Sequence, residues 1–159
     1  MYKGQRSDMG YVNGLLGRRP EDPRLRNAFE EAKKAGVEIS FVIEDFPPVR
    51  PNISHLTLEN TEGEQAVLYS DSTGGGTVRL MYYNGYDMDI VGDCYELLLL
   101  TSCGQEKSEE ILEKALALTG PDEGTSISVK GESSLINVKT RQEHTEEFLA
   151  RLKEIARVT

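Results

Sequence analysis

Apolar and polar residues alternate along much of the chain between positions 53 and 101, a period that predicts β-strands rather than helices. Short glycine-containing turn signals separate the alternating runs, and an Asn-Gly pair between two such runs is a strong hairpin signal. We therefore expect an antiparallel meander followed by one buried strand. The predicted strands are Ile53–Asn60, Gln65–Asp71, Thr77–Tyr83, Tyr86–Val91 and Tyr95–Thr101.

The first 50 residues carry a different, mainly helical pattern. Asp8 is a plausible N-cap for a short helix over Met9–Gly17, and Asp22 followed by a proline opens a second helix that ends at Gly36. The next run, Val37–Ile43, alternates and predicts a strand. A proline-rich connector follows it over Phe46–Pro51.

The region after residue 101 predicts a helix, two strands and a final helix. We expect the first helix to start at an N-cap, Ser108, and to stop at Gly120-Pro121. The remaining elements are predicted at Thr125–Val129, Leu135–Lys139 and Glu146–Val158. From Cys94 onward the order is β-α-β-β-α, half of a ferredoxin-like fold. The predicted class is α+β, with a first domain over 1–93 (a mixed or antiparallel sheet with flanking helices) and a βαββα domain over 94–159.

Composition excludes several classes of function. The chain has 159 residues and a formal net charge of −9, which argues against a general nucleic-acid surface. It has no run of about 18 apolar residues, so we expect no membrane span. Met1–Asp8 lacks the apolar core of a signal peptide, so we expect none. A reduced cytoplasmic location fits the cysteine usage best. Cys94 and Cys103 do not have a metal-binding spacing, and we interpret them as small buried hydrophobic residues rather than as a disulfide or reactive thiol.

Few residues have a pattern that predicts chemistry. His55 and His144 are the only histidines, and neither has a cysteine or carboxylate at metal-ligand spacing. Asp87 and Asp89 would share one strand face, where solvation is favoured over cation binding. Four clustered arginines could hold an anion, although solvated charges beside helices are the favoured interpretation: Arg18, Arg19, Arg24 and Arg26. We predict no catalytic residue and no metal site in this chain.

Three consecutive glycines, Gly74–Gly76, are the most informative local feature. Glycine loses more backbone entropy on folding than other residues, so such a run requires a reason in the backbone. A phosphate-binding loop would open into a helix, whereas this run opens into a β-branched segment. The glycines therefore mark either a bulged hairpin or a backbone contact with a ligand or partner.

The triplet belongs to an ordered set of motifs that resembles the β-subunit region of bacterial iron–sulfur L-serine dehydratases. The family's GHGTD, GLLG, PDD, HPN, SIGGG and NGF segments correspond in order to Gly4–Asp8, Gly14–Gly17, Pro20–Asp22, Arg50–Asn52, Ser72–Gly76 and Asn84–Tyr86. The resemblance covers roughly residues 4–100. A similar architecture is the allosteric substrate-binding (ASB) domain that precedes an ACT domain in some D-3-phosphoglycerate dehydrogenases. The resemblance thus implies an ASB-like domain followed by a divergent ACT-like domain.

This resemblance implies a regulatory or assembly subunit that takes part in serine deamination. Gln5 and Arg50 stand where the family has histidines, and an imidazole is the side chain best suited to move protons near neutral pH. The family therefore implies that the isolated chain is inactive, that a 4Fe-4S cluster lies on a partner α subunit, and that this chain holds no cofactor. The residues expected to bind serine, another small carboxylate or an anion are Gln5, Arg6, Ser7, Asp8, Arg50, Asn52, Thr73, Gly74, Gly75, Gly76 and Asn84. Two alternatives stay open, a regulatory portion of a phosphoglycerate dehydrogenase-like enzyme and a purely structural homo-oligomerisation module, and we expect a homodimer.

Overall fold

The fold, taken from a computed structural model, is α+β with antiparallel sheets, as the sequence predicts. The structure describes residues 6–43, 52–119 and 124–158. Contacts divide the chain into two compact units, Met1–Pro47 and Pro48–Thr159. Within the described ranges, no helix is long and apolar enough to cross a membrane.

The first unit is helical and consists of α1 (Ser7–Leu15), the 3-10 helix η1 (Pro23–Asn27) and α2 (Ala28–Lys34). Asp22 caps η1 as predicted, because its carboxylate accepts a hydrogen bond of 2.9 Å from the N–H of Arg24. The core of this unit is small and consists of Val12, Ala28 and Ala32, with Leu16 and Ile39 packed against them. Few large apolar side chains are therefore buried in this unit.

Two predicted features of the first unit are wrong. The first helix begins one residue before Asp8, at Ser7, and its N-cap is Arg6 in the left-handed region at φ 57°. The segment Val37–Ile43 does not form a strand. Its alternating pattern is real, but a strand also needs a neighbouring strand for its hydrogen bonds, and no described residue provides one. The predicted connector at Phe46–Pro51 lies outside the described residues.

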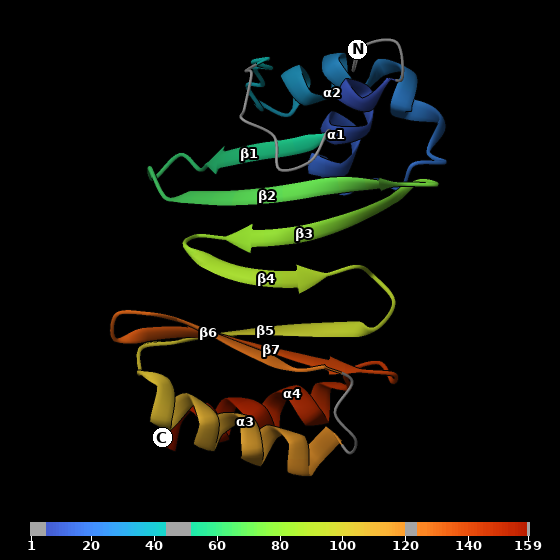
Figure 1. Cartoon of the computed structure of the whole chain (residues 1–159). Coiled ribbons are helices and arrows are strands. Elements are labelled where there is room, and N and C mark those ends of the chain that lie inside the picture. The colour runs from blue at the N-terminus through green and yellow to red at the C-terminus, as the bar shows by residue number, and fades with distance from the viewer. Residues whose placement is uncertain (1–5, 44–51, 120–123, 159) are drawn as a thin grey trace. The chain divides into compact units, whose positions relative to one another are not determined.

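The second unit begins with a four-stranded antiparallel meander, called sheet A here, in the order β1-β2-β3-β4 (Figure 1). Its strands are β1 (Ile53–Glu59), β2 (Gln65–Gly74), β3 (Thr77–Tyr83) and β4 (Tyr86–Ile90). The predicted meander is confirmed, although β2 continues three residues beyond the expected end. The continuation extends β2 into the glycine triplet.

The glycine triplet forms a bulged hairpin between β2 and β3, one of the two alternatives that the sequence left open. Gly75 and Gly76 are the two turn residues, and their φ angles of 63° and 83° define a turn of type I′. The register shifts between Ser72 and Gly74, where the bulge lies. A Cβ at any of the three glycines would meet no described atom within 4 Å. Backbone conformation, rather than close packing within the described chain, therefore accounts for the triplet.

A three-stranded antiparallel sheet, sheet B, follows in the order β5-β7-β6. It consists of β5 (Tyr95–Thr101), β6 (Ser126–Lys130) and β7 (Ser133–Thr140). The helices α3 (Gln105–Thr119) and α4 (Glu146–Val158) cover one face of sheet B (Figure 1). Because β7 lies between β5 and β6, the unit has the arrangement of a split β-α-β motif. The finer assignment to ASB-like and ACT-like domains stays a prediction.

The predicted start of α3 is wrong by four residues, because an N-cap at Ser108 places the first helical residue at 109. The helix begins at Gln105, and Ser108 lies inside it, where its N–H donates to the carbonyl of Gly104 at 3.2 Å. Ser108 is fully buried, and its hydroxyl lies 3.4 Å from both Thr101 Oγ1 and Cys103 Sγ. Tertiary packing against the end of β5 therefore outweighs the serine's preference for a cap position.

The two sheets meet at β4, which packs across β6 and β7. Their shared core contains Tyr86, Met88 and Leu135, with Leu80, Tyr83, Ile90 and Leu98 around them. Polar contacts reinforce this core, since the Tyr86 hydroxyl lies 2.7 Å from Ser133 Oγ and the Asp87 N–H donates to Ser128 Oγ at 3.1 Å. The boundary expected at residues 93 and 94 falls between the sheets, and whether it separates two domains stays a prediction.

We expect Gly75→Ala to lower the free energy of unfolding by about 1–2 kcal/mol, because a Cβ in the left-handed region is strained. Gly75→Asn should stay within about 0.5 kcal/mol of the natural protein, since asparagine tolerates this turn position. Urea unfolding of both variants measures the difference. Equal values for the alanine and natural proteins would contradict the assigned turn.

Candidate functional site

The predicted ligand-binding residues fall into several groups. Gln5 and Arg50 lie outside the described residues. The start of α1 carries Arg6, Ser7 and Asp8 in the first unit, where the Asp8 carboxylate accepts a hydrogen bond of 2.9 Å from the N–H of the next residue. The remaining predicted residues belong to the second unit. Ligand binding by any of these groups stays a prediction.

One end of sheet A gathers most of the second-unit residues. The Asn52 carbonyl accepts a hydrogen bond of 3.3 Å from the Ser72 N–H, which places Asn52 beside the glycine hairpin. Across the hairpin, the hydroxyls of Thr73 and Thr77 are 2.6 Å apart, and the Thr77 hydroxyl also donates to the Gly74 carbonyl. The Thr77 proton goes to the Gly74 carbonyl and the Thr73 proton to Thr77, so these hydroxyls are engaged within the hairpin. This end is exposed and offers backbone amides, groups that can hold an oxyanion but cannot serve as a base.

Asn84 lies at the opposite end of the same sheet. It follows Tyr83, the last residue of the seven-residue strand β3, and so stands roughly 20 Å from the glycine hairpin. Its side chain accepts a hydrogen bond of 2.7 Å from the Val67 N–H, and its φ of 49° suits the β3–β4 turn. The structure therefore does not bring Asn84 together with the glycines, and its local role is to shape a turn.

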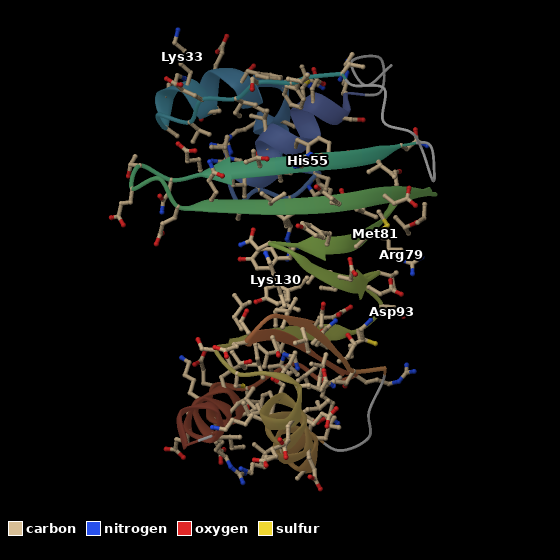
Figure 2. The ribbon with its side chains drawn as sticks, turned by 60° about the vertical axis from the view of Figure 1, so that its left-hand side comes forward. Lys33, His55, Arg79, Met81, Asp93 and Lys130 are labelled. Carbon is tan, nitrogen blue, oxygen red and sulfur yellow. The ribbon has the colours of Figure 1, made fainter. Side chains whose placement is uncertain are left out.

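The neighbouring Gly85 is required by its backbone conformation, and the flexible end of a lysine side chain lies against it. Its φ is 101°, and a Cβ there would clash with the side chain of Lys130. Lys130 reaches this turn from β6 and donates a hydrogen bond of 3.3 Å to the Asn84 carbonyl (Figure 2). The Asn-Gly turn is therefore part of the junction between the sheets.

A guanidinium and a carboxylate are paired across β3 and β4. Arg79 donates to both oxygens of Asp89, at 2.6 and 2.7 Å. The pKa of Arg79 is raised, first by this hydrogen bond, then by the charge of Asp89 and also by that of Asp71, its partner on β2. Asp89 is thus an ion-pair partner, and Asp87 is exposed, in agreement with the predicted solvated strand face.

Two of the four clustered arginines in the first unit are also engaged in ion pairs. Arg18 lies 3.2 Å from Glu31, and Arg24 lies 2.6 Å from Asp22. Hydrogen bonds from the Arg24 side chain and backbone hold the pKa of Asp22 well below its usual range. Arg24, with its side chain 59% exposed, agrees with the favoured interpretation of solvated charges beside helices, whereas the Arg18 side chain is largely buried at 15% exposed.

Neither histidine has the surroundings of a catalytic base. His55 lies edge-on to Tyr69, with ring centroids 4.6 Å apart, and is exposed on β1. The His144 Nε2 lies 3.0 Å from the Thr140 hydroxyl, and its ring stacks on Phe148 at 5.3 Å. Burial lowers the pKa of His144. Both rings have packing roles, as the sequence predicts.

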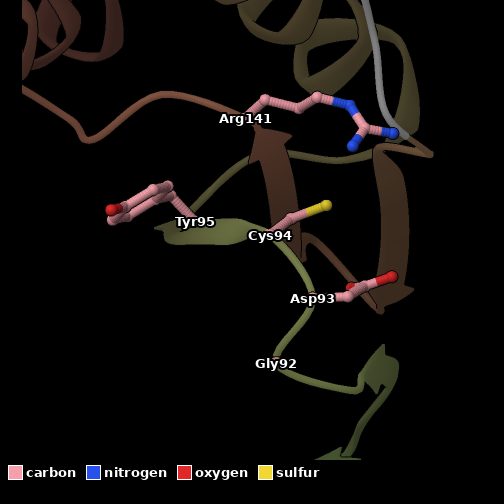
Figure 3. A pocket seen from close by; sticks show the side chains of 5 residues that line it. All are labelled: Gly92, Asp93, Cys94, Tyr95 and Arg141. Atoms are coloured by element: carbon pink, nitrogen blue, oxygen red, sulfur yellow. The ribbon is translucent and has the colours of Figure 1, made fainter.

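The two cysteines occupy different environments, and neither forms a disulfide. Cys103 packs against the core between sheet B and its helices, whereas Cys94 lines a shallow, open pocket of about 420 Å³. Figure 3 shows its thiol on the same side of the pocket as the side chains of Asp93 and Arg141, while Tyr95 points away. The small-hydrophobe interpretation therefore suits Cys103 better than Cys94.

These cysteines do not fit an iron–sulfur cluster held by this chain alone. A 4Fe-4S cluster takes four thiolates, and the chain has two cysteines in separate surroundings. Among the described residues, no group of three or more histidine, cysteine, aspartate or glutamate side chains is placed to hold a metal ion.

The sequence did not reveal an aromatic row across sheet A. The ring of Tyr69, which also contacts His55, stacks on Tyr82 with centroids 4.4 Å apart and an interplanar angle of 14°. The three residues lie opposite one another in the registers of β1, β2 and β3. Alternation alone placed each on a strand, but only the register shows that they meet.

The fold and the site define an α+β protein whose described residues form an exposed polar hairpin but no constellation of nucleophile, base and oxyanion donors. Comparison with known proteins shows which proteins this chain is similar to. The chain is 32% identical over 99 residues to the "Probable L-serine dehydratase, beta chain" of Bacillus subtilis (strain 168). It is 30% identical over 99 residues to the "L-serine dehydratase, beta chain" of Peptoniphilus asaccharolyticus.

Each match covers 62% of this chain, and the matches cover 44% and 45% of the two relatives. The chain therefore spans less than half the length of these relatives. No family model matches it. A region of the chain is thus similar to L-serine dehydratase β chains, which confirms the resemblance that the ordered motifs predicted.

Protonation of His144 should destabilise the second unit. Its pKa in the folded protein lies below the ordinary value of 6.5. The neutral ring therefore makes its full contribution to the free energy of unfolding above pH 6.5. Stability should fall as the pH drops from 6.5 to the folded-state pKa, and then level off. Nuclear magnetic resonance titration of the ring measures that pKa, and urea unfolding of His144→Gln should lose this part of the pH dependence. A ring that titrates above 6.5 would contradict the prediction.

Proposed function

We propose that this chain is a regulatory or assembly subunit of the β type in an iron–sulfur L-serine dehydratase. The enzyme would convert serine to pyruvate and ammonia on a partner α chain that holds the 4Fe-4S cluster. The observation that carries the proposal is the match over 99 residues to two L-serine dehydratase β chains, together with the ordered motifs. The word beta in both names supports a multi-chain enzyme.

The chemistry of the described residues supports a role without catalysis by the chain itself. The hairpin end of sheet A offers backbone amides, while both histidines are engaged in ring packing. Deamination of serine needs a group that removes a proton, and the family's two motif histidines are Gln5 and Arg50 here. The reacting centre would therefore lie on the partner.

Exposed apolar residues support the assembly part of the proposal. In the first unit, Val42 and Ile43 are 75% and 77% exposed, and Phe29 is 42% exposed. The small core of that unit leaves these side chains to be covered by another surface. An α chain is the partner that the names of the relatives support.

The glycine hairpin supports the binding part of the proposal. Exposed backbone amides in a left-handed conformation suit a carboxylate such as that of serine, or another small anion. An exposed site of this kind would bind weakly, as a sensor of millimolar metabolites does.

Co-expression with an iron–sulfur α-type chain tests the assembly role. We expect the two chains to purify together and to form pyruvate from L-serine, and this chain alone to form none. Val42→Ser with Ile43→Ser should weaken co-purification, because the apolar surface is lost. Val78→Ser is the control, since Val78 is 56% exposed but belongs to the second unit. Pyruvate formation by this chain alone would contradict the proposal.

Matched substitutions at the two ends of sheet A test the binding role. Asn52→Asp places a negative charge beside the glycine hairpin and should weaken L-serine or phosphate binding by about tenfold or more, measured by calorimetry. Asn84→Asp makes the same change at the opposite end and should leave affinity unchanged. Asparagine and aspartate both tolerate the positive φ of these positions, 73° and 49°. Equal losses, or no heat with the natural chain, would overturn the hairpin site.

A further inference from the structure

Three polar side chains are buried between sheet A and sheet B, on the face of sheet B that α3 and α4 do not cover. Glu96 lies on β5 opposite Lys139 on β7, and Asn137 stands two residues before Lys139. The Glu96 and Lys139 side chains are 8% and 12% exposed, and Asn137 is 2% exposed. Burying such groups is costly unless their hydrogen bonds are satisfied.

These side chains form a partly completed network beneath β4. The Asn137 Nδ2 donates to Glu96 Oε2 at 2.8 Å, and the Lys139 Nζ lies 3.6 Å from Glu96 Oε1, an ion pair without a hydrogen bond. The same ammonium group donates to the backbone carbonyl of Asp89 at 2.6 Å. The network therefore links β5 and β7 of sheet B to β4 of sheet A.

Two acceptor atoms of this network receive no hydrogen bond from the described residues, namely Asn137 Oδ1 and Glu96 Oε1. Exchanging the oxygen and nitrogen of the Asn137 amide does not satisfy these acceptors, because the amide oxygen would then face the Glu96 carboxylate. Lys139 retains donor capacity, since an ammonium group has three N–H bonds and one goes to Asp89. The site thus presents two acceptors and a cationic donor around one polar junction.

We propose that this junction is a binding site for a buried water molecule that donates to these acceptors and accepts from Lys139. A water needs two to four polar partners in a buried site, and these groups supply them. The charges of Glu96 and Lys139 cancel, which favours a neutral guest over a cation such as ammonium. The bound water completes the polar link between the sheets, independently of the function proposed above.

Magnetic relaxation dispersion of solvent water counts long-lived buried waters in the intact chain and tests the site. We expect Asn137→Leu to lose one such water, because the leucine removes an acceptor and presents an apolar side chain in its place. Asn27→Leu is the matched control and should lose none, since Asn27 is exposed and makes no side-chain cap hydrogen bond. A folded Asn137→Leu protein with an unchanged count overturns the proposal.

A second measurement needs no variant and covers the case in which Asn137→Leu fails to fold. Water-to-protein cross-relaxation in the natural chain should connect a bound water to the Asn137 side-chain amide protons, and its absence overturns the site. Thermal unfolding in ammonium chloride and in sodium chloride at equal ionic strength should give equal midpoints. A higher midpoint in ammonium alone would overturn the assignment of the guest as water.

Discussion

The second unit depends on β4, because its backbone pairs within sheet A while its side chains pack against sheet B. Its ladder with β3 satisfies one edge, while Tyr86 and Met88 bury their side chains against Leu135. Lys139 then holds the Asp89 carbonyl, and Arg79 holds the Asp89 carboxylate. Without β4, the outer edge of β3 would lose its backbone ladder, and Lys139 in the polar network of sheet B would lose the Asp89 carbonyl as an acceptor.

Positive φ angles explain the positions of the two strongest motifs, the glycine triplet and the Asn-Gly pair. The glycine triplet and the Asn-Gly pair both make tight hairpins of sheet A, and both satisfy a demand for left-handed φ. Their surroundings nevertheless differ, since the triplet is open while Gly85 lies against Lys130. The Asn-Gly motif therefore has a structural role at one end of sheet A, whereas the glycine triplet at the other end leaves space open for a ligand.

Sheet A could be predicted almost residue by residue because each strand alternates and each turn has its own glycine signal. Val37–Ile43 alternates equally well but forms no strand, since periodicity describes a face and not the presence of a pairing neighbour. Ser108 has the chemistry of a cap, but burial against Thr101 decides its place. The candidate site shows the same limit, because Asn84 and the glycines are close in sequence yet separated by the length of β3. The Glu96, Asn137 and Lys139 network depends on register and was not visible in the sequence.

The distribution of polar groups also bears on how such a chain would act in a larger enzyme. Its buried charges lie at the junction between sheets, where they orient β4, and its exposed amides and hydroxyls lie at the hairpin end. Catalysis needs a proton-transfer group held in a protected site, whereas the described hairpin is open to solvent. Sensing or docking needs only a rigid support and an accessible surface, and the β2–β3 hairpin on its paired sheet provides both. This arrangement of a paired sheet and an open hairpin is the support for the binding and positioning role proposed above.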